Sequence, residues 1–293
     1  MSGKLQAVRR IGVHLGVAGG MFKAVERAQE IGANTVQIFS SSPRMWRASK
    51  IPPEHAARTK ELRALYGCSP LVIHTGYLVN LCSQSAEVRA NSIRAFHGEV
   101  ERALELEAEY LVLHPGSWRG LTREEGLSLA AESIERALEG LPWPGRAFTI
   151  LIENTAGAEF SLGGSLEQVA ELIARLEAVA PVAACLDTCH LHAAGYDVVT
   201  AKGYHSTVDH VEQTLGARKV RVWHVNDAKS ARGSHLDRHQ HIGEGSIGIP
   251  LFRLLLNDPR FAHAAFIAET PIDEPGDDAR NLRLLRSLLA PPA

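Results

Sequence analysis

Short apolar runs alternate along the chain with longer stretches in which apolar residues recur at helical spacing. Eight of the runs have the length and the apolar, partly β-branched character of buried strands. They are Ile11 to His14, Thr35 to Phe39, Leu71 to His74, Tyr110 to His114, Phe148 to Glu153, Val182 to Asp187, Val220 to His224 and Ala265 to Glu269. Their C-terminal ends lie 25 to 45 residues apart, which is room for a helix and two loops. The pattern predicts parallel strands joined by crossover helices.

The segments between these runs carry helix signals. Val88, Phe96, Val100 and Leu104 keep roughly helical spacing among charged neighbours, so this helix is expected to lay one face on the strands. Capping boxes are predicted at two helix starts, Thr122 with Glu125 and Ser165 with Gln168. The final helix is expected over Asp278 to Ala290. Eight such units predict an α/β fold, a closed (β/α)8 TIM barrel, and no linker divides residues 1–293 into more than one domain.

Three connections are longer than the rest, and all follow strand C-termini. They are Ser40 to Pro53, Leu191 to Asp209 and Asn226 to Pro250. The C-terminal rim of a TIM barrel carries the active site, because loops from all strands meet there. The functional residues are therefore expected at this rim.

Composition narrows the class of protein. The 31 Lys and Arg against 33 Asp and Glu give a net charge of −2, so any DNA contact has to be a local patch. The cysteines Cys68, Cys82, Cys185 and Cys189 form no CxxC pair, and no apolar run approaches the roughly 18 residues that span a bilayer. A reduced, cytoplasmic setting without a membrane anchor is expected. The count of 14 His is high, and histidine is the commonest metal ligand.

Six predicted strands end in a residue that can bind a metal: His74, His114, Glu153, Asp187, His224 and Glu269. Any one of them alone could equally cap a helix or satisfy a loop amide. Together at one rim they favour divalent cations, because unpaired buried carboxylates and imidazoles are costly. Three further donors lie in the adjoining loops, His190, Asp237 and His239. Nine donors exceed the needs of one catalytic zinc and suit two or three ions with bridging carboxylates.

The remaining histidines are expected at the surface or as hydrogen-bonded core residues, as most single histidines are. They are His14, His55, His97, His192, His205, His210, His235, His241 and His263. His14 is the least settled of these, because it also ends a predicted strand.

Seven stretches of the chain resemble the endonuclease IV family, the zinc-dependent abasic-site nucleases. They are His74-Thr-Gly-Tyr-Leu-Val-Asn-Leu81, Leu113-His-Pro-Gly-Ser117, Ile152-Glu-Asn-Thr-Ala-Gly157, Leu186-Asp-Thr-Cys-His-Leu-His-Ala-Ala-Gly-Tyr-Asp197, His224-Val-Asn-Asp-Ala-Lys-Ser230, Asp237-Arg-His239 with Gly243-Glu-Gly-Ser-Ile-Gly248, and Ala268-Glu-Thr270. The resemblance covers essentially the whole chain. It implies a TIM barrel that carries three zinc ions, with manganese an alternative at one position, and its ligand positions fall on the nine donors.

The resemblance also implies how the donors are divided among the ions. One ion is expected on His74 and His114, with Glu153 bridging to a second that is bound by Asp187, His224 and Glu269, and the third is expected on His190, Asp237 and His239.

By the same resemblance, the loops after the second and third strands enter the DNA minor groove, which points to Arg44, Tyr77 and Leu78. An inserted wedge unstacks a base step, and this costs least where a base is missing. The alternatives without a role in DNA binding are core packing for Tyr77 and Leu78 and a solvated surface cation for Arg44. Five basic residues of the rim loops could grip phosphates, Arg47, Lys50, Lys229, Arg232 and Arg238. The chain departs from the family around Ser41 to Met45 and at Gln240.

The implied reaction is hydrolysis of the phosphodiester 5′ to an abasic site in duplex DNA by a monomer, leaving a 3′ hydroxyl, with 3′-phosphodiesterase activity beside it. Zinc would make a bound water acidic enough to attack phosphorus as hydroxide. Glu153 is the first candidate to orient or deprotonate that water, and Glu269 the second. One rival is a xylose isomerase-like sugar isomerase or epimerase that uses one metal on four of the donors. Another is a DNA-damage-binding protein with a structural metal site.

Overall fold

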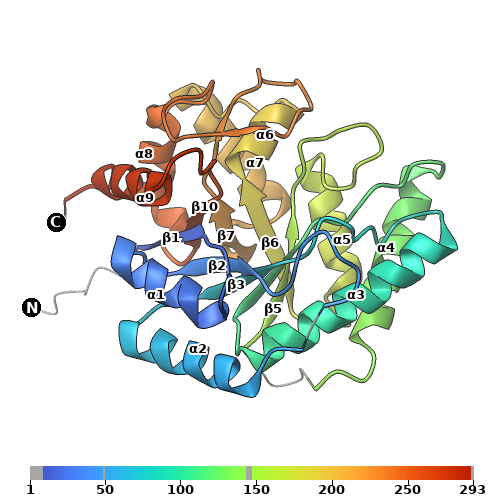
Figure 1. The fold of residues 1–293 in the computed structure, drawn as a ribbon. Coiled ribbons are helices and arrows are strands. Elements are labelled where there is room, and N and C mark those ends of the chain that lie inside the picture. Colours follow the sequence, from blue (N-terminus) through green and yellow to red (C-terminus); the bar gives the residue numbers. More distant parts are fainter. Residues whose placement is uncertain (1–8, 49, 143–146, 292–293) are drawn as a thin grey trace, which may run out of the picture.

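Eight parallel strands close into a barrel in the computed structural model, which describes residues 9–48, 50–142 and 147–291 (Figure 1). The ends of the domain predicted over 1–293, and residue 49 of the first long loop, lie outside the described residues. The strands are β1 (Arg10–His14), β2 (Val36–Phe39), β3 (Leu71–His74), β4 (Tyr110–Leu113), β5 (Thr149–Glu153), β6 (Val182–Asp187), β7 (Val220–His224) and β10 (Ala265–Ala268). They follow one another in chain order around the ring, and β1 closes it by pairing with both β2 and β10. The predicted TIM barrel is confirmed.

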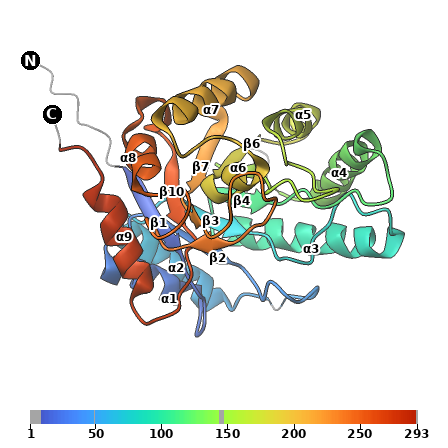
Figure 2. The same cartoon turned by 90° about the horizontal axis from the view of Figure 1, so that it is seen from above.

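Helices surround the strands, as the view from above shows (Figure 2). They are α1 (Met21–Ile31), α2 (Pro53–Tyr66), α3 (Ala86–Glu105), α4 (Arg123–Leu138), α5 (Leu166–Leu176), α6 (Thr188–Ala194), α7 (Ala201–Thr214), α8 (Ile249–Asn257) and α9 (Asp277–Ser287), with 3-10 turns η1 (Ala217–Lys219) and η2 (Pro259–Phe261). In α3, Phe96, Val100 and Leu104 are buried as their spacing predicts, whereas Val88 in the first turn is only partly buried. Among the described helices, none is both long and apolar enough to cross a membrane.

The strand predictions are correct to within one residue at each end. His114 and Glu269 lie one residue past β4 and β10, so they belong to the rim loops. The last helix ends at Ser287 rather than at the predicted Ala290, because the Asn257 side chain accepts from the Ala290 amide and donates to the Leu288 carbonyl.

One of the two predicted capping boxes is complete. Thr122 accepts from the Glu125 amide at 3.2 Å, and the Glu125 carboxylate accepts from the Thr122 amide at 2.7 Å. Ser165 caps α5 alone, because the Gln168 side chain accepts instead from the Gly163 and Gly164 amides. The second predicted capping box is therefore wrong, because the Gln168 side chain does not bond the Ser165 amide.

The core has two layers, as a barrel requires. A small interior layer, including Val72, Val112 and Leu151, fills the space enclosed by the strands. A larger layer lies between the strands and the surrounding helices. The four cysteines are buried in these layers and unpaired. Because apolar side chains plug the interior, the polar strand ends are confined to the C-terminal rim.

Candidate metal centre

The six predicted strand-end donors meet at the C-terminal rim, around the carboxylate of Glu153. Glu153, Asp187 and His224 are fully buried at the ends of β5, β6 and β7. The His74 and His114 Nε2 atoms lie 3.1 and 2.9 Å from one Glu153 oxygen, Oε2. The other oxygen, Oε1, faces the opposite group of donors. Glu153 thus stands between two sets of donors, the position of a bridging carboxylate.

The second set gathers around His224. Its Nδ1 atom lies 2.9 Å from Glu153 Oε1, 3.2 Å from Glu269 Oε2 and 3.9 Å from Asp187 Oδ2. Four ligand atoms, one from each of these residues, lie within 4.8 Å of one another. Three carboxylates and one imidazole are a donor set suited to a divalent cation.

The third set lies nearer the surface, where α6 and the loop after β7 meet. Asp237 is shared: its Oδ2 lies 3.3 Å from His190 Nε2 and its Oδ1 lies 3.2 Å from His239 Nε2. His239 Nε2 also lies 3.6 Å from Asp187 Oδ2. Residues 237 and 239 point the same way because they are two apart in an extended segment that leads into β9 (His239–Gln240), which pairs with β8 (Asp227–Ala228).

Hydrogen bonds fix which ring nitrogen of four histidines faces the carboxylates. The Nδ1 atoms of His74, His190 and His239 donate to backbone carbonyls at 2.8, 2.8 and 3.0 Å, and His224 Nε2 donates to a side-chain amide oxygen. A carbonyl oxygen only accepts, so these nitrogens carry a proton, and in the neutral ring the opposite nitrogens carry the lone pair. Metal-bound histidines in proteins are oriented in this way.

The donors are spaced closely enough to share divalent cations. Two ligands at about 2.0–2.1 Å from a tetrahedral zinc are themselves about 3.3 Å apart. The separations within the three sets run from 2.9 to 3.9 Å, a range that includes this value and also that of ordinary ion pairs. In addition, the buried His239 Nε2 makes no hydrogen bond, although two carboxylates flank it. A buried nitrogen of this kind is costly unless it is bound to a cation.

The ionisation of the cluster indicates the same need for positive charge. Burial raises the pKa of Glu153, but the His114 and His224 rings lower it by more, so its pKa lies well below the usual value. Burial lowers the pKa of His239, but the carboxylates of Asp187, Asp237 and Glu269 together raise it to about 9. The pKa is also raised for His74, His190 and His224 and lowered for Asp237 and Glu269. Protons or divalent cations can supply this charge.

Comparisons with known proteins decide the family. A sequence model described as a xylose isomerase-like TIM barrel matches residues 25–288. A protein named probable endonuclease 4 from Solibacter usitatus is 50% identical over 282 residues, covering 95% of this chain and 96% of that protein. The chain belongs to the endonuclease IV family.

Solved structures agree with this assignment. The crystal structure of endonuclease IV from Thermus thermophilus has a TM-score of 0.85 at 38% identity, covering 95% of this chain and 98% of that one. A D-tagatose 3-epimerase-like protein has a TM-score of 0.70 at 20% identity, which is a likeness of fold alone. The sequence resemblance is thus confirmed for this endonuclease IV family member.

Of the predicted groove-entering residues, Tyr77 lies beside the metal centre. Tyr77 and Leu78 are 66% and 36% exposed, and the Tyr77 ring also contacts Phe39 edge-on at 5.3 Å. Tyr77 lines a cavity of about 600 Å³ together with His114, His190 and Glu269. The tip that carries these residues is fixed to the next rim loop by Asn80, whose side chain accepts from the Ser117 amide and donates to its carbonyl.

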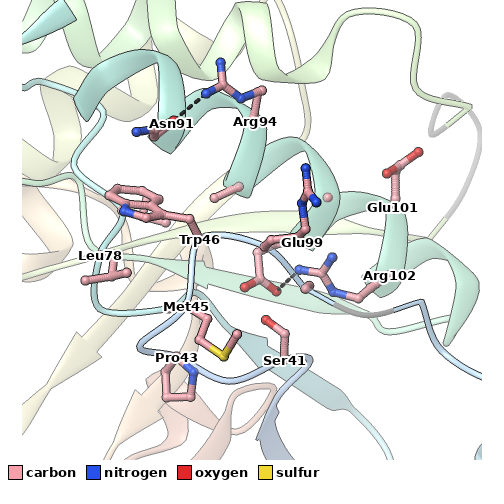
Figure 3. Close-up of a pocket in the computed structure, with 16 residues that line it drawn as sticks. Ser41, Pro43, Met45, Trp46, Leu78, Asn91, Arg94, Glu99, Glu101 and Arg102 are labelled. Carbon is pink, nitrogen blue, oxygen red and sulfur yellow. Dashed lines mark hydrogen bonds and ion pairs between the residues drawn. The ribbon is translucent and has the colours of Figure 1, made fainter. Parts of the chain in front are cut away.

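A second hollow, of about 440 Å³, lies between α3 and the loop that carries Arg44 (Figure 3). Trp46 of this loop and Leu78 line the hollow, and Glu99 and Arg102 line it from the α3 side. Ser40, at the start of the loop, donates to the buried Glu99 carboxylate and accepts from Arg102 Nε at 2.9 Å. This contact attaches the loop to α3.

The basic residues of the rim loops are exposed, and not all are free. Arg44, Arg47, Lys50, Lys229, Arg232 and Arg238 are all solvent-exposed. Arg232 forms an ion pair with Asp197 at 3.1 Å. Arg238 donates to the Asp237 carbonyl at 2.7 Å.

Sequence reasoning missed a layer of polar residues behind the donors. The amide of Asn226 donates to Asp187 Oδ2 at 2.6 Å and its oxygen accepts from the Glu269 amide at 2.7 Å. The buried Asp227 carboxylate accepts from the backbone amides of Gly243, Ile247 and Gly248, which holds the loop after β9. They lie two and three residues after His224, so polar residues shortly past a strand-end donor were the available signal.

Proposed function

We propose that this endonuclease IV family member hydrolyses the phosphodiester 5′ to an abasic site in duplex DNA and leaves a 3′ hydroxyl. The observation that carries the proposal is the cluster of nine donors around Glu153, at the floor of an open cavity that exposed loops surround. Such a site accommodates an extended anionic substrate laid across the rim.

The nine donors would hold three zinc ions, with manganese an alternative at one of them. His74 and His114 would share Glu153 with the set of Asp187, His224 and Glu269, and a third ion would take His190, Asp237 and His239. When bound, zinc supplies an acidified water as nucleophile and positive charge for the phosphate oxygens. The tautomers fixed by hydrogen bonding support this division, because each free nitrogen faces the carboxylate it would share.

Glu153 would orient the attacking water, and Glu269 is the second candidate. A carboxyl whose pKa lies well below the usual value stays ionised at neutral pH and accepts a hydrogen bond from water without taking up the proton. Both carboxylates are held in place by several partners, so they lose little entropy when the substrate binds.

Selectivity for damaged DNA would come from the two exposed loops. Arg44, Tyr77 and Leu78 would enter the minor groove, and a step that lacks a base costs least to open. The exposed basic side chains of the same rim would contact phosphates, so the formal charge of −2 is no obstacle to local binding.

The same centre would also remove blocked 3′ ends, because that reaction breaks the same kind of phosphodiester. All nine donors come from one chain, which supports action as a monomer. The reduced state of the four buried cysteines suits the cytoplasm.

The test is cleavage of a duplex that carries one abasic analogue, with an intact duplex as control. We expect a single nick on the 5′ side that yields an extendable 3′ hydroxyl, and complete inhibition by a strong chelator. Absence of a nick, combined with chelator-sensitive epimerisation of a ketose, would favour the sugar epimerase instead. Binding without either reaction would favour a damage-binding protein.

A further inference from the structure

A glutamine lies inside the barrel in an otherwise apolar strand. Gln37 of β2 is fully buried between Val36 and Ile38, and the barrel register sets it beside His14 of β1. A buried amide is stable only if its two N–H donors and its oxygen are satisfied. Its partners therefore show what it does.

Three contacts satisfy the Gln37 amide. Its nitrogen donates to Glu269 Oε1 at 2.5 Å and to His14 Nδ1 at 3.0 Å, and its oxygen accepts from His224 Nε2 at 2.8 Å. The carboxylate of Glu269 only accepts, which fixes the amide so that nitrogen faces Glu269 and oxygen faces His224. The orientation of the side chain is thus fully determined.

This orientation sets the tautomer of His224. The Gln37 oxygen requires a proton on His224 Nε2, so in the neutral ring that binds a cation the lone pair is on Nδ1. Nδ1 is the atom that faces the carboxylates of Glu153 and Glu269, at 2.9 and 3.2 Å. The opposite tautomer would direct an N–H at the donor set.

The same amide also assigns the two oxygens of Glu269. Oε1 is taken by the bond from Gln37, whereas Oε2 is the oxygen that lies 3.2 Å from His224 Nδ1. One residue therefore controls two members of the donor set, from a strand that contributes no donor itself.

We propose that Gln37 is a positioning residue of the metal centre, which presents His224 Nδ1 and Glu269 Oε2 to the ion. This inference rests on the proposed function of the rim as a metal centre. Gln37 itself would not touch the metal or the DNA. Replacing it with leucine leaves the buried His224 Nε2 without this partner and leaves Glu269 Oε1 with the longer contact to His14 Nδ1 at 3.5 Å, so both side chains can reorient. Loss of such a supporting bond lowers metal affinity by roughly 10–100-fold.

The experiment measures metal binding directly. Metal-free wild-type protein and the Gln37→Leu variant are titrated with zinc against a chromophoric chelator. We expect the variant to lose roughly 10–100-fold in affinity at one class of site while the other sites stay unchanged. The matched control is Asn34→Leu, which removes an amide just before β2 that bonds only the Ile11 amide and the Arg9 carbonyl. This control should bind zinc as the wild type does.

A second measurement needs no variant to fold. In zinc-loaded wild-type protein with ¹⁵N-labelled histidine, long-range proton–nitrogen correlation should show the His224 proton on Nε2. A proton on Nδ1, or equal zinc affinity of wild type and Gln37→Leu, would overturn the inference. Nicking by the wild type would still stand in either case, so this failure is distinct from failure of the proposed function. A wild type that binds no zinc would overturn both.

Discussion

The orientation of the donor side chains depends on hydrogen bonds to groups outside the donor set as well as on their position in the chain. His74, His190 and His239 each have one ring nitrogen bound to a backbone carbonyl, and the other nitrogen is thereby directed at a carboxylate. The backbone is rigid at a strand end, so the donor is held without a separate loss of entropy. The reactivity of the rim therefore depends on groups that are not donors.

Glu153 is the residue on which the proposed chemistry depends most. Glu153→Gln keeps the shape but removes the charge that the surrounding histidines stabilise. We expect cleavage of abasic DNA to fall by at least about a hundredfold, the range for a group acting directly in catalysis, with DNA affinity retained. Single-turnover cleavage and a gel-shift titration measure the two separately.

The control for this substitution is Glu61→Gln, an exposed carboxylate of α2 on the outside of the barrel. Its cleavage rate should match the wild type. Retention of most activity by Glu153→Gln would remove Glu153 from the mechanism.

At the scale of elements, the barrel strands place most of the donors, and separate hydrogen bonds fix the individual rim loops. The β-rich runs and their spacing are enough to predict the strands, because parallel crossover units have a narrow range of lengths. They are also enough to predict which residues meet at the rim. The Gln168 side chain bonds the Gly163 amide rather than Ser165, and α9 ends where Asn257 binds the Ala290 amide. These choices depend on the tertiary contacts and not on a local sequence pattern.

Gln37 and Asp227 show where sequence reasoning stops. A polar residue within an apolar strand was visible as Val-Gln-Ile-Phe, but its partners, His224 and Glu269, lie about 190 and 230 residues away. Asp227 lies three residues after a predicted donor, His224, yet its role depends on the path of the loop after β9. Contacts between distant segments arise only when the barrel closes.

The attachment of the Arg44 loop to α3 gives a prediction about DNA binding. Glu99→Gln weakens the buried contact with Ser40 and Arg102, at a cost of about 1–3 kcal/mol in the free energy of unfolding. We expect the KM for abasic DNA to rise several-fold with kcat nearly unchanged, because the loop is needed to bind rather than to react. Steady-state cleavage kinetics give both constants.

Glu101→Gln, at an exposed position of the same helix, should leave KM unchanged. A fall in kcat with constant KM in Glu99→Gln would contradict the assignment of this loop to binding.

The lower end of the barrel gives a prediction about pH. Burial, together with Arg221 and Arg218, lowers the pKa of His263, which bonds the Val220 carbonyl at 3.0 Å. Above pH of about 6.5 the ring is neutral in both states, and below it the unfolded chain binds the proton first. The contribution of His263 to the free energy of unfolding is therefore full above that pH and is lost as the pH falls further.

Urea unfolding between pH 7.5 and pH 5.5 measures this effect by difference. The wild type should lose more stability over this interval than His263→Gln, which does not titrate. The exposed His205→Gln should follow the wild type. Equal slopes for wild type and His263→Gln would refute the prediction.

At the scale of the whole molecule, the metal ions are expected to hold the C-terminal rim together. The donors come from strands, helix α6 and rim loops all around the barrel, and several carboxylates lie within 4.8 Å of one another. Each site filled at 100 times its dissociation constant adds about 2.7 kcal/mol to the free energy of unfolding. We expect a strong chelator to lower the Tm by several degrees, at about 2–4 °C per kcal/mol for a chain of this size.

Differential scanning calorimetry with and without the chelator checks this expectation, and restoring zinc should recover the original Tm. An unchanged Tm would mean that the rim is stable without cations and that the cluster is not a high-affinity metal centre.

One titration tests most directly whether the rim is a centre of several metal ions that cuts DNA. Metal-free protein receives zinc in fractions of one equivalent, and nicking of the abasic duplex is followed together with bound metal. We expect nicking to stay low until more than one equivalent is bound and to become maximal near about three per chain. Maximal nicking at one equivalent, or none with about three bound, would contradict a centre of several catalytic ions.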